Sequence, residues 1–465
     1  MTGRPDPRLA ALASTVDGVA WPPIATGAAA TIGALLHRLD RTQWLEPDRL
    51  AALQRVQLDV VGRWFAAQVP HVAARLAAAG VGADELGRPG ALAALAPLRR
   101  RDLVTADGAF GCAPPPSHQP TDASITSGST GTPVEVQRTR VSATVHAATS
   151  VRAQLWHDLD LAAPVAAVRH GPAGPEHLPT WGPPTDQLFA TGPSLALPVD
   201  LPVDELIAHL IAFGPATLLC YPTVLGAIAA EVAAGRAALP TVRRLQSIGE
   251  TLEPGVRAAV AAAWPDSTLR DLYSSQEAGL LAAECPDRGA LHVMAEHVVL
   301  EVLDDHDRPV APGEVGHVFV TDLHNLATPI IRYEQGDLAE VGGPCPCGRG
   351  LPTLARVRGR ARNLLRLADG RAFFPIFGVP RYRSVAPVLQ QQVVQHDTDT
   401  LEVRLVTEAP LDEAQEAALR SIVREAVGHP LQVRFTYHDH LDRGPTGKYE
   451  EFISLVPEPL VPDRP

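Results

Sequence analysis

Hydrophobic and polar positions divide the chain into stretches with different periods. Residues 1 to about 110 are rich in Ala, Leu and Arg and follow a helical pattern, which is clearest over residues 50–63. A proline-rich stretch, residues 113–120, then interrupts the pattern, because proline cannot continue a helix. The sequence therefore predicts a mostly helical N-terminal segment that ends near residue 110.

The next part of the chain alternates between two patterns. From residue 134 to about residue 285, short β-branched runs alternate with alanine-rich helical stretches, which is typical of α/β layering. Residues 134–137 are expected to form a strand, with a helix from about Ser142. Residues 217–220 are likewise expected to end a strand, and a helix is expected to open at Pro222.

Residues 291–342 have a different character. Val298–Leu303 and His317–Thr321 are expected to be strands, and Gly/Pro turns flank them. This pattern predicts a small β-subdomain.

The C-terminal stretch predicts a unit of its own. Residues 401–406 alternate as a strand, Asp412 and Gln415 have the spacing of a helix capping box, and Gly428 ends that helix. Another strand is expected at residues 431–437, and the unit ends in the loop 442–448. The helix has one apolar stripe, formed by Leu419, Ile422, Val423 and Ala426.

Together the patterns predict an α/β fold with two domains. The large N-terminal α/β domain covers residues 1–360 and includes the small β-subdomain, and the small mobile α+β domain covers residues 361–465. A chain of 465 residues is long enough for more than one core.

Composition and charge narrow the function classes. The net charge of −12 argues against nucleic acid or an anionic membrane as the partner. No apolar run approaches the roughly 20 residues that cross a bilayer, and no secretory signal is evident. Five cysteines without an export signal indicate reduced thiols. We therefore expect a cytoplasmic protein, and a homodimer is compatible with the sequence.

The segment Thr126–Pro133 is a hydroxyl- and glycine-rich loop of the kind that surrounds nucleotide phosphates. Gly128 and Gly131 allow backbone N–H groups to turn toward an anion, and neighbouring hydroxyl groups add donors. The loop lacks the Gly-Lys-Ser/Thr ending of a Walker loop. Four further segments are candidates for the same site: residues 271–277, 331–337, 358–360 and 444–448. The first is expected where a strand ends and a helix begins, and the second is expected to place Asp337 at a tight turn.

These five segments, in this order, resemble the motifs of the adenylate-forming superfamily of acyl-CoA synthetases, and the similarity is greatest to the phenylacetate–CoA ligase family. The resemblance extends from about residue 100 to about residue 450. It implies that the large domain binds ATP and a carboxylic acid and that the small domain rotates between two poses. The positions that match the nucleotide site are Ser127, Gly128, Ser129, Thr130, Gly131, Gly249, Glu250, Thr251, Asp271, Tyr273, Gln276, Asp337 and Arg360.

The resemblance also implies a role for each position. The loop around Thr130 holds the β- and γ-phosphates, Tyr273 stacks on adenine, and Asp271 accepts from the adenine amino group. Asp337 binds the ribose hydroxyls. The catalytic residues are Thr130 of the loop, Glu277, which holds Mg²⁺ through hard oxygen ligands, and Lys448, which stabilises negative charge in the transition state. Residues 221–225 and the stretch before Gly249 are expected to line the acid pocket.

Three positions depart from the family pattern. The lysine that commonly follows the second glycine of the loop is absent, since Thr132 stands there. Gln276 replaces a hydroxyl residue, although an amide can still donate to a phosphate. Arg362 replaces the usual hinge acid. The CoA half-reaction is therefore less firmly implied than adenylation.

A second candidate site combines three cysteines and a histidine. Cys285, His292, Cys345 and Cys347 suit a tetrahedral structural Zn²⁺, and some relatives of the phenylacetate–CoA ligase family look alike here. His297 competes as the fourth ligand. Buried free thiols are the alternative, whereas a disulfide conflicts with a reducing compartment.

The leading interpretation is an AMP-forming acid–thiol ligase. A small carboxylic acid, for which the resemblance implies an aromatic or related one, reacts with ATP to give acyl-AMP and pyrophosphate, and coenzyme A then takes the acyl group. The alternative uses the same adenylation with an amine, a carrier protein or another nucleophile. A P-loop kinase and a non-catalytic nucleotide-binding scaffold are the competing classes. The absent Walker ending argues against the first, and the presence of both Glu277 and Lys448 argues against the second.

Overall fold

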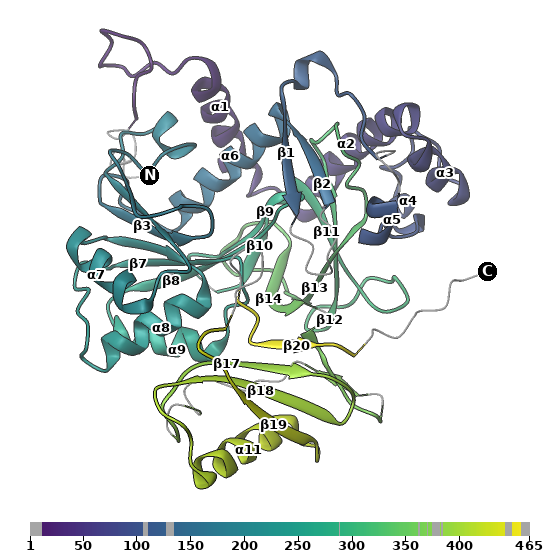
Figure 1. Cartoon of the computed structure of the whole chain (residues 1–465). Coiled ribbons are helices and arrows are strands. Elements are labelled where there is room, and N and C mark those ends of the chain that lie inside the picture. The colour runs from purple at the N-terminus through teal and green to yellow at the C-terminus, as the bar shows by residue number, and fades with distance from the viewer. Residues whose placement is uncertain are drawn as a thin grey trace. The chain divides into compact units, whose positions relative to one another are not determined.

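The computed structural model describes residues 12–105, 110–126, 134–287, 289–360, 363–369, 371–373, 382, 385–441 and 449–456. Internal contacts divide the chain into two units (Figure 1). The first contains residues 1–252 and 256–357, and the second contains residues 253–255 and 358–465. The sequence-based boundary at residue 360 lies near the second division.

The first unit begins with the helical segment that the sequence predicts. Its helices are α1 (Gly27–Thr42), α2 (Pro47–Gln68), α3 (Pro70–Ala78), α4 (Ala91–Ala94) and α5 (Arg100–Thr105). The buried face of α2, which includes Val61 and Phe65, packs against Val72 and Leu76 of α3 and against Ile331. The 3-10 turn η2 (Pro116–His118) then leads into a hairpin of β1 (Thr121–Thr126) and β2 (Val134–Thr139).

A 12-stranded sheet forms the centre of the first unit, in the order β11-β12-β13-β14-β10-β9-β8-β7-β6-β3-β5-β4. Its parallel part consists of β3 (Val165–Arg169), β5 (Ser194–Pro198), β6 (Thr217–Cys220), β7 (Arg244–Ile248) and β8 (Thr268–Ser275), and β4 (Glu176–Leu178) adds an antiparallel edge. The remaining strands are β9 (Gly279–Glu284), β10 (Leu291–Val293), β11 (Val298–Leu303), β12 (Val315–Asp322), β13 (Tyr333–Val341) and β14 (Thr353–Arg360). The strands expected as a β-subdomain therefore continue the central sheet.

Helices and a short 3-10 turn accompany the central sheet. They are α6 (Arg140–Trp156), α7 (Val203–Phe213), α8 (Pro222–Ala233) and α9 (Pro254–Ala263), with the 3-10 turn η3 (Thr185–Gln187). One continuous core joins α7, α8 and α9 to strands β3, β5, β6 and β7, and these helices gather on one side of the strands in Figure 1. α6 packs with α1 in a separate core and lies against β9 through Ala153 and Leu280.

The second unit is an α+β domain. Its four-stranded sheet has the order β19-β18-β17-β20, from β17 (Val388–Gln395), β18 (Thr400–Thr407), β19 (Gln432–Tyr437) and β20 (Phe452–Ser454). A small hairpin pairs β15 (Leu365–Arg366) with β16 (Ala372–Phe373). Helix α11 (Glu413–Val427) has the predicted capping box of Asp412 and Gln415 and ends at Gly428, whose φ is +62°. The α/β fold with a small α+β unit is thus confirmed.

No helix in the described part of the chain combines the length and apolar content that crossing a bilayer requires.

Candidate active site

The hairpin β1–β2 borders the predicted phosphate loop. Thr126 pairs with Val134, the two residues on either side of the loop. The loop residues, Ser127, Gly128, Ser129, Thr130, Gly131 and their neighbours up to residue 133, lie outside the described residues. Val136 of β2 packs in one core cluster with Tyr333 and Ile330. The hairpin is therefore anchored on the start of β13.

Two tyrosines join the predicted carboxylates across the sheet. Tyr273 of β8 donates a hydrogen bond of 2.7 Å to Oδ2 of Asp337 on β13. In the opposite direction, the hydroxyl of Tyr333 on β13 lies 3.3 Å from Oε1 of Glu277, which follows β8. All four residues are buried. The structure thus brings Glu277 and Asp337, which are 60 positions apart in the sequence, into one crossed pair of tyrosine–carboxylate contacts.

Both local predictions around these carboxylates were wrong. Glu277 does not open a helix, because β8 turns directly into the antiparallel strand β9 at residues 276–278. Asp337 does not lie at a tight turn, because β13 runs from Tyr333 to Val341. Strand β13 has a register shift against β12, because His317 pairs with Leu338 whereas Phe319 pairs with Glu334, and Gly336 between them has φ of +74°. Side chains therefore do not simply alternate between Tyr333 and Asp337, so the pattern of the segment carries no signal for the role of Tyr333.

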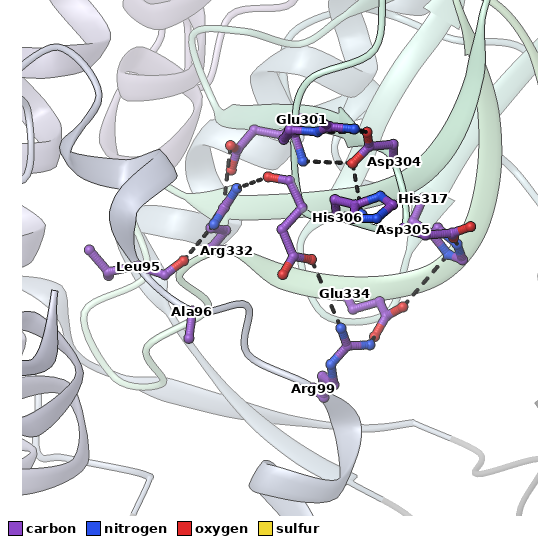
Figure 2. Close-up of polar contacts among 12 residues, drawn as sticks. Leu95, Ala96, Arg99, Glu301, Asp304, Asp305, His306, His317, Arg332 and Glu334 are labelled. Carbon is purple, nitrogen blue, oxygen red and sulfur yellow. Dashed lines mark hydrogen bonds and ion pairs between the residues drawn. The ribbon is translucent and has the colours of Figure 1, made fainter. Parts of the chain in front are cut away.

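Arg332 fixes the start of β13 (Figure 2). Its backbone is left-handed, with φ of +51°, and its side chain is 2% exposed. The guanidinium donates to the carbonyls of Ala93, Leu95 and Asp307, and its Nε lies 3.4 Å from Oε1 of Glu301. A non-glycine residue holds this conformation only where its surroundings determine it. Arg332 therefore positions Tyr333, the next residue.

The strand ends of the parallel sheet supply Asp271 and Ser247. The hydroxyl of Ser247 on β7 donates a hydrogen bond of 2.6 Å to Oδ1 of Asp271 on β8. The backbone N–H of Asp271 donates 2.8 Å to Glu284. Burial raises the pKa of the Asp271 carboxyl to about 6, although the hydrogen bond from Ser247 acts in the opposite direction. Asp271 is therefore an acceptor held in a fixed orientation.

The predicted purine segment is tied to helix α8. Glu250 accepts hydrogen bonds from the backbone N–H of Thr223, at 3.1 Å, and from its hydroxyl, at 2.7 Å. A carboxylate at this end of a helix is favourable because the first N–H groups have no partner within the helix. Gly249 has φ of +86°, which a Cβ would disfavour. The neighbouring Thr251 is half-buried and Gln276 is exposed.

Two predicted residues belong to the second unit. Arg360 is exposed at the end of β14. Lys448 lies outside the described residues, as does Arg362 of the hinge segment.

Three cysteines and one histidine converge at a second place in the first unit. Their ligand atoms, from Cys285, His292, Cys345 and Cys347, all lie within 4.8 Å of one another. Sγ of Cys285 is 3.8 Å from Sγ of Cys345, and Sγ of Cys347 is 3.3 Å from Nε2 of His292. A tetrahedral ion with Zn–S bonds of about 2.3 Å separates two sulfurs by about 3.8 Å. The donor set therefore fits a closed zinc site.

His297 does not join this cluster. Its Nε2 lies 2.7 Å from the carbonyl oxygen of Ala278, and its neighbours are Asp322 and His324. The competing fourth ligand considered from the sequence is therefore excluded, because β10 carries His292 toward the cysteines whereas the turn after it carries His297 elsewhere.

The turn with Cys345 and Cys347 is clamped onto the N-terminal helices. Arg349 lies over the rings of both Trp44 and Trp156, with its guanidinium carbon 4.8 Å from each ring centroid. Its Nε donates 2.8 Å to the side-chain oxygen of Gln43. A Cβ on Gly350 would lie 1.8 Å from the carbonyl oxygen of Leu45. The cysteine turn thus links the central sheet to the α1–α2 connection.

Solved structures share this architecture. The 2-hydroxyisobutyryl-CoA ligase, in its postadenylation state with a bound acyl-AMP, matches with a TM-score of 0.69 over 90% of this chain and 92% of that chain, at 18% identity. The chain has the adenylate-forming fold. An anthranilate CoA ligase in complex with anthranoyl-AMP matches with a TM-score of 0.50 over 70% of this chain and 65% of that chain, at 17% identity.

Sequence comparisons agree with the fold and cover smaller parts of the chain. Residues 382–454 match the CapK C-terminal domain. The phenylacetate-coenzyme A ligase of Thermus thermophilus is 34% identical over 85 residues, which are 18% of this chain and 19% of that protein. The aligned segment spans about a fifth of that relative. The resemblance that the sequence motifs indicated, to adenylate-forming acyl-CoA ligases, is confirmed.

Proposed function

We propose that this protein activates a small carboxylic acid with ATP, releasing pyrophosphate, and then transfers the acyl group from acyl-AMP to the thiol of coenzyme A. The solved structures that resemble it include ligases of this chemistry with acyl-AMP bound. Both the small carboxylic acid as substrate and coenzyme A as acceptor are part of the proposal. An amine or a carrier protein as acceptor is the alternative outcome of the test below.

The observation that carries the proposal is the pairing of Glu277 and Asp337 through Tyr333 and Tyr273. Asp337 provides the carboxylate for the ribose hydroxyls, and Glu277 provides a hard oxygen ligand for Mg²⁺. Both carboxylates are buried, and each is held by a tyrosine hydroxyl. Fixed acceptors of this kind cost little reorganisation when the nucleotide binds.

Other residues complete the proposed nucleotide site. Asp271 accepts from the adenine amino group, and the stretch Gly249–Thr251 runs along the purine. The loop residues Ser127 to Gly131, with Thr130 at their centre, surround the β- and γ-phosphates. Bound Mg²⁺ neutralises phosphate charge there. Gln276, which is exposed, donates its amide to the α-phosphate, and Arg360 is assigned to the ribose.

Lys448 is assigned to the transition state. It is the only lysine among the 40 lysine and arginine residues of the chain. A compact ammonium concentrates its charge on one point, whereas a guanidinium spreads it over a planar fork. The use of lysine at this one position supports a role that requires the smaller cation, between the attacking carboxylate and the α-phosphate.

We also propose that Cys285, His292, Cys345 and Cys347 bind a structural Zn²⁺. Four protein ligands leave no open position for a substrate. The ion would therefore hold the β13–β14 turn against the end of β9.

The test is acid-dependent pyrophosphate release from ATP, measured over a panel of aryl, aliphatic and amino acids with and without CoA. Release together with a CoA thioester supports the full proposal, and release without a thioester moves the acceptor to an amine or a carrier. Release that persists in Lys448→Ala would contradict the assignment of the lysine, and a product of ADP would contradict adenylation altogether.

The single lysine allows a chemical version of the same test. An amine-acylating reagent removes the charge of the Lys448 side chain, and no other side-chain amine is present. Loss of activity should follow acylation at Lys448, as read by mass spectrometry, and ATP with the acid should slow it. Lys448→Arg is the control for the labelling read by mass spectrometry, because its side chain cannot react.

A further inference from the structure

A third group of metal-ligating side chains lies outside both sites. His297 precedes β11, and Asp322 and His324 lie at the end of β12. Their ligand atoms lie within 4.8 Å of one another. His297 is 0% exposed and Asp322 is 2% exposed, while His324 is half-buried. This set contains two imidazoles and one carboxylate, and no sulfur.

The hydrogen bonds of His297 leave one ring nitrogen for a ligand. Its Nε2 lies 2.7 Å from the carbonyl oxygen of Ala278, so this nitrogen carries the proton. Its Nδ1 is buried and has no hydrogen-bond partner among the described residues. Histidines that bind metals commonly donate their other N–H to a backbone carbonyl, which fixes the ring and the free lone pair. His297 has this arrangement.

His324 faces the same place. Its ring stacks at 19° on the ring of His297, with centroids 6.1 Å apart. Its Nδ1 is also buried without a hydrogen-bond partner in the described part of the chain. A buried polar atom without a partner destabilises the folded state. Two such nitrogens therefore lie on neighbouring rings, beside one carboxylate.

The carboxylate of Asp322 is oriented by its own turn. Oδ1 accepts from the backbone N–H of His324, at 2.8 Å, and of Asn325, at 3.0 Å. Oδ2 has a longer contact of 3.3 Å from the hydroxyl of Ser142, at the start of α6. Two backbone donors therefore hold one oxygen, and the second oxygen remains available beside the two imidazoles.

We propose that His297, Asp322 and His324 bind one divalent transition-metal ion. Two imidazoles and one carboxylate suit Zn²⁺, Fe²⁺ or Co²⁺. Three protein ligands leave at least one coordination position open to water or to an oxygen of a bound molecule. This distinguishes the site from the closed cysteine cluster, and the inference does not depend on the proposed adenylation.

The proposed site lies beside the turn between β8 and β9. Ala278, whose carbonyl bonds His297, directly follows Glu277. Gly279 lies against His146 of α6, where a Cβ would come within 2.5 Å of Nδ1, and the rings of His146 and His297 are 6.5 Å apart. The proposed site thus contacts, through His297, the same β8–β9 turn that carries the candidate Mg²⁺ ligand.

Cobalt distinguishes the two sites by spectrum. The full chain is stripped with a chelator under reductant and titrated with Co²⁺. Thiolate ligands give Co²⁺ an intense charge-transfer band, which a site of imidazole and carboxylate lacks. We expect about two Co²⁺ per chain, one with and one without the thiolate band. Cys345→Ser should lose the thiolate band and keep the second ion.

His324→Ala tests the site directly. It should lower the stoichiometry by about one ion and leave the thiolate band unchanged, while the exposed His306→Ala serves as a matched control that changes neither. The persisting thiolate band shows that the variant is folded, and Asp322→Asn provides a second variant of nearly the same shape. A parent protein that binds one Co²⁺, or a His324→Ala protein that still binds two, would overturn the proposal.

Discussion

Tyr273 and Asp337 are joined by a hydrogen bond of 2.7 Å although their strands, β8 and β13, are not neighbours in the sheet. The sequence motifs assign Tyr273 to adenine and Asp337 to ribose. The bond couples the two side chains, so a change in either residue should affect the binding of the whole nucleoside.

The first prediction concerns ATP affinity. Asp337→Asn removes a charged acceptor and should raise the KM for ATP about 10- to 100-fold, whereas Tyr273→Phe removes one neutral donor and should raise it about 5-fold. Each substitution should change kcat by a smaller factor than it changes the KM for ATP. Steady-state kinetics with varied ATP measures both. Tyr437→Phe, which removes an exposed hydroxyl in the second unit, is the control. Equal effects on kcat and KM would refute a binding role.

The second prediction concerns Mg²⁺. If Glu277 holds the ion, Glu277→Gln should raise the Mg²⁺ concentration needed for half-maximal adenylation by more than about 10-fold. Tyr333→Phe should raise it by less, because it removes only the hydroxyl that orients the carboxylate. Titration of pyrophosphate release with MgCl₂ measures the shift, and excess Mg²⁺ should rescue Tyr333→Phe. If the activity of Glu277→Gln is restored by more ATP but not by more Mg²⁺, the assignment of Glu277 as the Mg²⁺ ligand is wrong.

The third prediction concerns acid stability. Burial lowers the pKa of His157 to about 4, below its usual 6.5, and both ring nitrogens have partners, Glu284 O at 2.9 Å and Gln246 Nε2 at 2.7 Å. The unfolded chain therefore binds more protons than the folded chain between these two values. The free energy of unfolding should fall as the pH drops from about 6.5 to about 4, by up to about 3 kcal/mol from this residue.

Urea unfolding at several pH values measures that loss. His157→Gln should give a flatter profile between pH 6.5 and 4, at the expense of lower stability at pH 7. His306→Gln, an exposed histidine, should leave the profile unchanged. A parent protein equally stable at both ends of this range would contradict a neutral buried His157.

The fourth prediction concerns the cysteine cluster. Cys345→Ser should release about one Zn²⁺ per chain and lower the midpoint of thermal unfolding by about 5–10 °C. Cys112→Ser should do neither, because Cys112 lies outside the cluster. Metal analysis and calorimetry measure the two effects. A parent protein that contains no zinc when purified without chelator would remove the basis of this prediction.

The sequence predicted the elements whose signals are local. Helix α11 follows from Asp412, Gln415 and Gly428, because a capping box and a left-handed glycine act within one turn. Strand β11 follows from an apolar run with β-branched residues. The three cysteines of the cluster could be chosen by chemistry, since the chain has only five, but the histidine could not, because the chain has 17 and His297 competed with His292.

Relationships between distant segments could not be derived in this way. The bond from Tyr273 to Asp337 depends on how β8 and β13 are placed in one sheet, and strand order is not encoded by any single segment. The group of His297, Asp322 and His324 depends on the pairing of β11 with β12. That pairing sets Val298 opposite Asp322 and so brings residues that are separated in the sequence to one end of the hairpin.

The distance between Cys285 and Cys345 also makes the metal-free protein sensitive to oxidation by air. Two sulfurs 3.8 Å apart are close enough that, without a metal to hold them as separate thiolates, mild oxidants would join them. The covalent bond would close a loop of the chain and withdraw two donors at once. Protein stripped by a chelator in the absence of reductant should then no longer take up zinc until a thiol is added. The conditions of purification would therefore decide whether the dithiol or the disulfide form is studied.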